Sequence, residues 1–240
     1  MKIVTYATHS EGKFEELINN KYGVKIDVLG WGQKWNGFTD KFIGIIEYLK
    51  NTHDDEIVIF LDGFDTNIVR DTHDLESTFK KLNCRILLSK ENSSPLVKYV
   101  FGSCKNNKGA NSGLYMGYAK ELRQLLEKSS KFNCKDDQIN LNASCSYFDN
   151  LKIDEDEIIF QNINPIFGNK KNSNPYFRSY PGTLSVKRIY RAVVNDYPQF
   201  FINTITSIVL LLMYMFPSWS PYLFVLFIVY YSVMDHSCKV

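Results

Sequence analysis

The most constraining feature of this 240-residue chain is a short apolar run that ends in two carboxylates. The run covers Ile57–Leu61 and is followed directly by Asp62, Gly63, Phe64 and Asp65. A short, continuous apolar run predicts a strand buried on both faces, as in an α/β sheet. Ligands of such sheets bind beyond the carboxyl ends of the strands, and a glycine there lets the backbone turn tightly.

Two carboxylates in one turn repel each other unless a positive charge lies between them. A hard divalent cation supplies that charge, and it commonly carries substrate phosphates as well. Asp62 and Asp65 are therefore candidate ligands of a metal ion. The alternative is a turn that carries two solvated aspartates.

Charge and cysteine content narrow the class of protein. The net charge of +2 gives no basic footprint of the kind that nucleic-acid binding requires, so we expect no nucleic-acid partner. The five cysteines include no CxxC pair, which argues against a zinc knuckle. Their odd, dispersed set favours a reducing compartment over a disulfide framework. The N-terminus leads directly into a strand pattern and shows no secretory signal.

Strand and helix patterns alternate along most of the chain. Strand patterns cover residues 2–7, 24–29, 57–61, 84–89 and parts of 151–160, and helical patterns cover 13–20, 38–50, 74–82 and 114–127. A short helix is expected after Lys135, and the Asn- and Pro-rich segment 161–180 is expected to be a loop. This alternation predicts an α/β fold with a sheet flanked by helices.

Four further places carry candidate ligand-binding residues. Trp35 is either a stacking platform for a base or sugar, or a core aromatic. Lys41 lies near the start of a helix and either reaches a phosphate or is simply solvated. The turn Gly109–Gly113 is expected to open the helix 114–127 and to present N–H groups to an anionic or hydroxyl-rich ligand, or only to cap the helix. Asp136–Gln138 suits sugar hydroxyls and includes a candidate base, although adjacent acids also mark exposed helix starts.

The last forty residues differ in character from the rest. Residues 200–216 and 222–234 carry no formal charge and are separated by Pro217–Pro221, and the first run would span ~25 Å as a helix. We expect a hairpin of two helices that spans or enters a membrane, the alternative being a helix pair packed on a soluble domain. Lys187, Arg188 and Arg191 precede the hairpin and Lys239 follows it, which predicts that the catalytic domain lies in the cytosol. The expected organisation is a domain at 1–185, a basic linker at 186–199, the hairpin at 200–234 and a tail at 235–240.

The order of these features resembles the glycosyltransferase domains of the lysyl hydroxylases and procollagen galactosyltransferases. The resemblance covers roughly residues 1–185. It rests on the following segments: Val4–Thr8, Gly30–Gly37 with Trp35, Lys41, Phe60–Asp65, Asn111–Gly113 and Asp136–Gln138. It implies a GT-A-like fold with a Rossmann-type mixed sheet, a UDP-sugar donor and Mn²⁺ or Mg²⁺ as the cation.

The resemblance also assigns roles to residues. Asp62 and Asp65 would hold the metal ion, Phe64 would lie against the uracil, and Asn111, Asp136 and Asp137 would face the transferred sugar and the acceptor. The remaining residues that the resemblance implies for the donor site are Thr5, Tyr6, Ala7, Trp35, Lys41, Gly63, Ser112, Gly113, Gln138 and Gly182. One departure concerns Ser179, which stands where the family places a histidine ligand of the metal.

The sequence thus predicts a membrane-anchored, metal-dependent glycosyltransferase that moves a sugar from a UDP-sugar to a hydroxyl of a protein or glycan. The main alternative is an inactive relative that acts as a membrane-tethered binding module, and the missing histidine favours it. A Mg²⁺-dependent phosphohydrolase built on the same pair of acids is a third possibility. It does not account for Asn111–Gly113 or Asp136–Gln138.

Overall fold

The computed structural model of the chain describes residues 1–91, 95–132, 134–163, 174–181 and 198–233. The chain divides into two compact units. The first unit comprises Met1–Phe132 and Asp137–Thr183, and the second comprises Asn133–Asp136 and Leu184–Val240. The predicted linker 186–199 lies almost wholly, and the tail 235–240 wholly, outside the described residues.

The described part of the first unit is built on a mixed sheet of six strands in the order β2-β1-β3-β6-β5-β7. The strands are β1 (Lys2–Tyr6), β2 (Asp27–Leu29), β3 (Ile57–Asp62), β5 (Ile86–Lys90), β6 (Ala110–Tyr118) and β7 (Leu151–Asp154). Strands β2, β1 and β3 are parallel, β6 is antiparallel to both of its neighbours, and β7 is parallel to β5. The predicted mixed sheet flanked by helices is confirmed.

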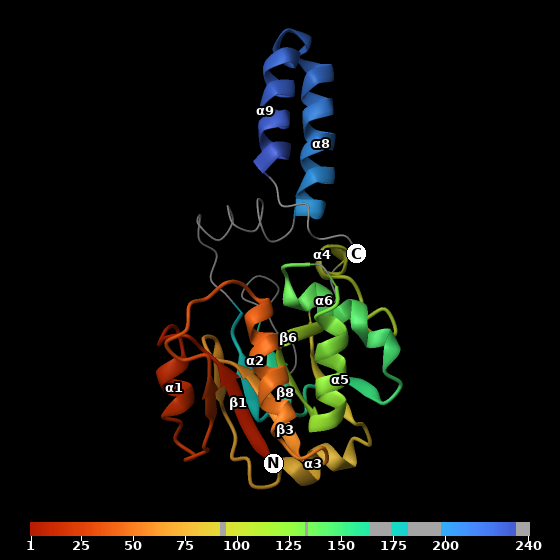
Figure 1. Cartoon of the computed structure of the whole chain (residues 1–240). Coiled ribbons are helices and arrows are strands. Elements are labelled where there is room, and N and C mark those ends of the chain that lie inside the picture. The colour runs from red at the N-terminus through yellow and green to blue at the C-terminus, as the bar shows by residue number, and fades with distance from the viewer. Residues whose placement is uncertain (92–94, 133, 164–173, 182–197, 234–240) are drawn as a thin grey trace. The chain divides into compact units, whose positions relative to one another are not determined.

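Each face of this sheet is covered by its own group of elements. Helices α2 (Thr39–Lys50), α5 (Ala119–Ser129) and α6 (Asp137–Ser144) pack on one face, where they form a core with Val4, Val58, Phe60 and Tyr115 (Figure 1). Helices α1 (Phe14–Ile18) and α3 (Leu75–Lys81) pack on the other face against Ile57, Ile59 and Leu61. Burial on both faces explains the uninterrupted apolar run of β3.

A second sheet of three described strands packs beside α1. Its apolar residues join the core that α1 and α3 form with the large sheet. Its strands are β4 (Thr66–Ile68), β9 (Phe177–Ser179) and β8 (Phe160–Asn162), in the order β4-β9-β8. Strand β9 corrects the expectation that residues 161–180 form a loop. The antiparallel pairing of β4 with β9 places Ser179 directly opposite Thr66, the neighbour of Asp65.

The segment 109–118 corrects another expectation. It is the strand β6 and not a turn that opens a helix at residue 114, because its two edges are paired with β3 and β5. The following helix, α5, begins at Ala119 and buries Leu122, Leu125 and Leu126, as the periodicity predicts. Asn111, Ser112 and Gly113 are therefore strand residues and offer no helix N-terminus to a ligand.

The cysteines also depart from expectation. Cys104 follows α4 (Pro95–Phe101), and it forms a disulfide with Cys145 at the start of the short helix η1 (Cys145–Tyr147), with 5.0 Å between their Cα atoms. Cys84 is a buried free thiol. The predicted set of unpaired cysteines is wrong for Cys104 and Cys145, which are distant in sequence but adjacent once β6 and α6 have packed.

The second unit contains two helices joined by a short turn. Helix α8 (Pro198–Met215) packs against α9 (Ser220–Val233), and η3 (Pro217–Trp219) connects them. Large apolar side chains on both helices and on the turn are exposed, among them Leu210, Tyr214, Trp219, Tyr222 and Leu226. Among the residues that the structure describes, no helix meets the length and apolarity needed to cross a membrane.

Candidate active site

The carboxyl ends of β1 and β3 meet in close contact with β6. A Cβ atom on Gly63 would lie 2.9 Å from Thr5 Oγ1 and 3.2 Å from Ala7 Cβ, so a side chain at that position would displace β1. A Cβ atom on Gly113 would lie 3.5 Å from the Cβ of Asp62. The two glycines thus bring β1 and β6 against the acidic turn that follows β3.

The two acids of this turn are held in different ways. Asp62 is the last residue of β3, and its Oδ1 accepts a hydrogen bond from the backbone N–H of Phe64 at 3.1 Å. Asp65 Oδ1 accepts hydrogen bonds from Ser179 Oγ at 2.9 Å and from Thr66 Oγ1 at 3.3 Å. Burial, and then the negative charge of Asp62, raise the pKa of Asp65 to about 7. The two carboxylates therefore interact strongly in the cation-free protein.

Lys41 connects this acidic turn with the start of α6. Its side chain is only 9% exposed, and its Nζ lies 2.7 Å from Asp137 Oδ2 and 3.4 Å from Asp62 Oδ2. Burial alone would lower the pKa of Lys41, but the charges of Asp137 and Asp62 outweigh it and raise the pKa overall. Lys41 is thus a buried, charged lysine between two carboxylates, and the alternative of a simply solvated lysine is wrong.

Asp136 and Asp137 are 3% and 4% exposed. Helix α6 begins at Asp137, so the predicted helix start is correct, but the alternative of an exposed pair of acids is wrong. Asp137 forms the ion pair with Lys41. Asp137 is thus a buried carboxylate at the start of α6, beside a lysine that also contacts the acidic turn.

A network of amides centres on Glu91, which our sequence reasoning missed. Glu91 is 8% exposed, and its Oε2 accepts hydrogen bonds from Asn111 Nδ2 at 2.9 Å and from Gln138 Nε2 at 3.1 Å. Asn111 Oδ1 accepts from the N–H of Gly113, and the N–H of Ser112 donates to Gln138 Oε1 at 3.5 Å. Glu91 directly follows strand β5, so the reasoning that identified Asp62 would also have identified it.

The aromatic residues proposed for the donor lie near the end of β1. The ring of Trp35 is 6.1 Å from that of Tyr6, and Trp35 is 38% exposed, which favours a stacking platform over a core aromatic. Phe64 is half-buried, and its ring lies 5.3 Å from that of His9. Thr5 is fully buried and donates its hydroxyl hydrogen to the carbonyl of Leu61 at 2.7 Å.

Of the two remaining predicted donor-site residues, Ala7 and Gly182, the structure describes only Ala7. Ala7 is buried, and its N–H donates to the carbonyl of Leu29. Gly182 lies outside the described residues. The structure therefore brings together Lys41, Asp62 and Asp137, with Asp65 in the same turn, whereas Thr5 and Ala7 serve the packing of β1 against its neighbours.

The candidate ligands for a metal ion are the two carboxylates of Asp62 and Asp65. In the part of the chain that the structure describes, no group of three or more His, Cys, Asp and Glu side chains is placed to hold a metal ion. Ser179 directs its hydroxyl to Asp65. Two adjacent carboxylates that repel each other fit a hard cation such as Mn²⁺ or Mg²⁺, with water and phosphate oxygens as further ligands.

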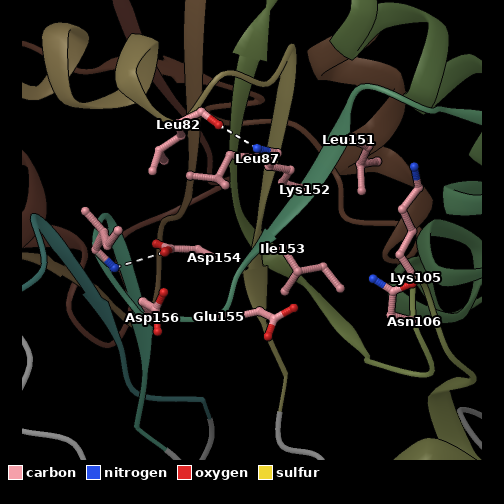
Figure 2. A pocket seen from close by; sticks show the side chains of 11 residues that line it. Leu82, Leu87, Lys105, Asn106, Leu151, Lys152, Ile153, Asp154, Glu155 and Asp156 are labelled. Atoms are coloured by element: carbon pink, nitrogen blue, oxygen red, sulfur yellow. Dashed lines mark hydrogen bonds between the residues drawn. The ribbon is translucent and has the colours of Figure 1, made fainter.

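A pocket of about 400 Å³ lies elsewhere, along the strand β7 (Figure 2). Its lining includes Leu87 and Ile153, and Lys152 donates to the carbonyl of Leu82 at 2.8 Å. Asp154 accepts a hydrogen bond from the N–H of Ile158 at 2.9 Å and is thereby bound to the backbone. None of the residues that line this pocket belongs to the predicted site.

The model of the PLOD GT domain family matches residues 1–176. A multifunctional procollagen lysine hydroxylase and glycosyltransferase of Caenorhabditis elegans is 27% identical over 195 residues, in a match that covers 68% of this chain and 26% of that protein. Procollagen-lysine,2-oxoglutarate 5-dioxygenase 1 of Gallus gallus is 23% identical over 189 residues, in a match that covers 68% of this chain and 25% of that protein. The chain thus spans about a quarter of the length of these relatives.

Among solved structures, the galactosyltransferase LgtC in complex with donor and acceptor sugar analogues is similar to this chain with a TM-score of 0.45 and 14% identity. The similarity covers 76% of this chain and 87% of LgtC.

Proposed function

Because this chain belongs to the PLOD GT domain family, we propose that it is a glycosyltransferase that transfers a sugar from a UDP-sugar to the hydroxyl of a protein or glycan acceptor. The observation that carries the proposal is the position of Lys41. Its ammonium group lies between Asp62, in the acidic turn, and Asp137, at the start of α6. The ammonium group of Lys41 therefore contacts both a residue assigned to the donor, Asp62, and a residue assigned to the acceptor, Asp137.

Asp62 and Asp65 would hold Mn²⁺ or Mg²⁺. The donor atoms are carboxylate oxygens. Burial and then the negative charge of Asp62 raise the pKa of Asp65, and a bound cation would relieve the repulsion between the two carboxylates. When bound, the cation stabilises the negative charge of the departing diphosphate. Lys41 is placed to add a second positive charge to that diphosphate, since it already faces Asp62.

Asp137 is the proposed base that takes the proton from the acceptor hydroxyl. Asp137 is buried. The next residue of α6, Gln138, belongs to the hydrogen-bond network with Glu91 and Asn111, so that network lies beside Asp137. Amide and carboxylate groups of this kind bind sugar hydroxyls. Trp35 would form a stacking surface, with Phe64 against the base of the nucleotide.

The hairpin α8–α9 is proposed to bind a membrane. Its helices expose large apolar side chains, including Leu211, Met215, Phe224 and Val229, and residues 198–233 carry no formal charge. Exposed apolar surface of this extent marks an interaction site. The basic residues that flank the hairpin favour the cytosolic side for the catalytic domain. The disulfide Cys104–Cys145 favours an oxidising compartment, and this is the placement that we propose.

The alternative of an inactive binding module is favoured by one observation. Ser179 replaces the expected histidine and donates its hydroxyl hydrogen to Asp65. An inactive relative would bind UDP without releasing it from a UDP-sugar.

A donor screen tests the proposed function. Full-length protein is incubated with Mn²⁺ and individual UDP-sugars, and released UDP is measured with and without Asp137→Asn. We expect UDP release from at least one donor, and a loss of turnover of about 10²- to 10⁴-fold in the variant with little change in donor affinity. Release of inorganic phosphate would instead indicate a phosphohydrolase. Equal turnover of both proteins would return Asp137 to a capping role.

A further inference from the structure

The core beneath the candidate site contains a hydroxyl group without a hydrogen-bond partner. Tyr115 lies in β6, opposite Phe60 of β3 and Leu88 of β5, and its side chain is fully buried. Its hydroxyl makes no hydrogen bond among the described residues. Leaving a buried hydroxyl unsatisfied is unfavourable, so such a group in a native core calls for a function.

The sheet geometry directs this hydroxyl towards the site. Residues opposite each other on paired strands share a face of the sheet, as do residues two apart on one strand. Tyr115 therefore shares a face with Phe60, whose ring lies 4.8 Å away, and with Asp62. Helices α2 and α6, which carry Lys41 and Asp137, cover that same face.

The electrostatic surroundings agree with this placement. Burial, followed by the charges of Asp137 and Asp62, raises the pKa of Tyr115 well above its ordinary value. The hydroxyl thus keeps its proton and is available as a donor near two carboxylates.

One of those carboxylates has a matching unused acceptor. Asp137 Oδ2 is buried and lies 2.7 Å from Lys41 Nζ, in an ion pair that lacks hydrogen-bond geometry. Asp137 therefore depends on Lys41 for its counter-charge, and it keeps an acceptor position open. A buried donor and a buried acceptor, both unsatisfied, lie in the same part of the core.

We propose that Tyr115 is a positioning residue whose hydroxyl donates a hydrogen bond to Asp137 when a bound diphosphate draws Lys41 away. Without that bond, Asp137 would be left as a buried carboxylate with no partner. The hydrogen bond from Tyr115 would hold the carboxylate in place and orient it towards the acceptor. The inference rests on the proposed role of Asp137 as a base.

The first test is Tyr115→Phe in the full-length protein, with UDP release from UDP-glucose and UDP-galactose in Mn²⁺ as the assay. We expect kcat to fall about tenfold, the usual effect of one hydrogen bond to a charged group, with KM for the donor nearly unchanged. The matched control is Tyr176→Phe, because the Tyr176 hydroxyl donates to Asp74 at 2.8 Å, away from the site. The control should lower the melting temperature and leave kcat unchanged.

The second test needs no activity. Melting temperatures are measured for Tyr115→Phe in the natural protein and in the Lys41→Met background, where Asp137 has lost its ammonium partner. We expect the loss of the hydroxyl to be neutral or stabilising in the first case and destabilising in the second. The same effect in both backgrounds, with kcat unchanged by Tyr115→Phe, would overturn the inference. Full turnover of Asp137→Asn would contradict the proposed role of Asp137 as a base, and absence of UDP release from the natural protein would contradict the proposed function. In either case the melting temperatures would still report on the interaction between Tyr115 and Asp137.

Discussion

At the scale of single residues, the acids of the site could be found from the sequence, but their surroundings could not. Asp62, Asp65 and Asp137 stand out because each is next to a strand or helix boundary that the apolar pattern marks. The ion pairs of Lys41 require α2, β3 and α6 to be packed together, and no local pattern encodes that packing. The role of Ser179 likewise appears only when β9 pairs with β4.

The raised pKa of Asp65 leads to a prediction about pH. A proton bound to Asp65 must leave before a cation can bind, so the affinity for Mn²⁺ should rise as the pH increases from about 5 to about 7 and level off above that. Over the same range the cation-free protein should lose stability from this group, because its pKa is higher folded than unfolded and ionisation therefore favours the unfolded chain. Calorimetric titration of Mn²⁺ into the protein with UDP measures the effect.

The control for this titration is Asp65→Asn, which has no carboxylate to titrate. We expect it to bind Mn²⁺ weakly at every pH. If the variant kept the same pH dependence as the natural protein, another group would be responsible for it.

A second prediction concerns Ser179→His. The Ser179 hydroxyl lies 2.9 Å from Asp65 Oδ1, so a side chain at this position is directed to the proposed cation site. An imidazole is a better ligand for Mn²⁺ than a hydroxyl, and we expect several-fold tighter binding. Ser179→Ala is the control, since it removes the hydrogen bond to Asp65 and adds no ligand. Equal affinities of the two variants would show that residue 179 does not reach the cation.

At the scale of elements, the sequence-based predictions failed where pairing with distant strands determines the secondary structure. The small and polar residues at the start of β6 suggest a turn, yet Ala110–Tyr118 is a strand because neighbouring strands pair with both of its edges. Strand β9 was missed because three residues in an Asn- and Pro-rich segment carry no periodicity. In contrast, α2 was predicted well, and the buried stripe of α5 was predicted although its start was placed five residues too early, since both stripes repeat along the helix.

The disulfide gives a prediction for helix α6. Cys104 and Cys145 are 41 residues apart, and a cross-link over such a loop stabilises a protein by about 4 kcal/mol in the chain-entropy model. Cys145 is fully buried just after α6, so Cys145→Ser should lower the melting temperature and speed amide hydrogen exchange in α6. Cys84→Ser is the matched control, because Cys84 is a buried cysteine outside any loop closure. Equal effects of both variants would show that packing of the sulfur, and not the cross-link, is responsible.

At the scale of the whole molecule, two observations bear on the compartment and lead to different expectations. The basic residues around the hairpin predict a cytosolic domain, because lysines and arginines that flank a membrane segment stay on the cytosolic side. The disulfide predicts an oxidising environment. The sequence carries two N-glycosylation motifs, Asn92–Ser94 and Asn142–Ser144, which would be acceptors only if the domain were lumenal. Asn142 in the Asn142–Ser144 motif is 2% exposed and hydrogen-bonded to the backbone of Ala110, and Asn92 lies outside the described residues.

The last prediction therefore uses thiols and protease in intact membrane vesicles that contain the full-length protein. A cytosolic domain would be digested from outside, and Cys104 and Cys145 would react with a maleimide once the protein is denatured. A domain in an oxidising lumen would be protected, and the two cysteines would react only after reduction. We expect the second result. The charge rule concerns the flanks of the hairpin, whereas the disulfide Cys104–Cys145 is part of the folded core that holds α6 and forms in an oxidising compartment. Labelling of Cys104 and Cys145 without a reductant would instead support the cytosolic placement, and Cys84→Ser controls for the free thiol.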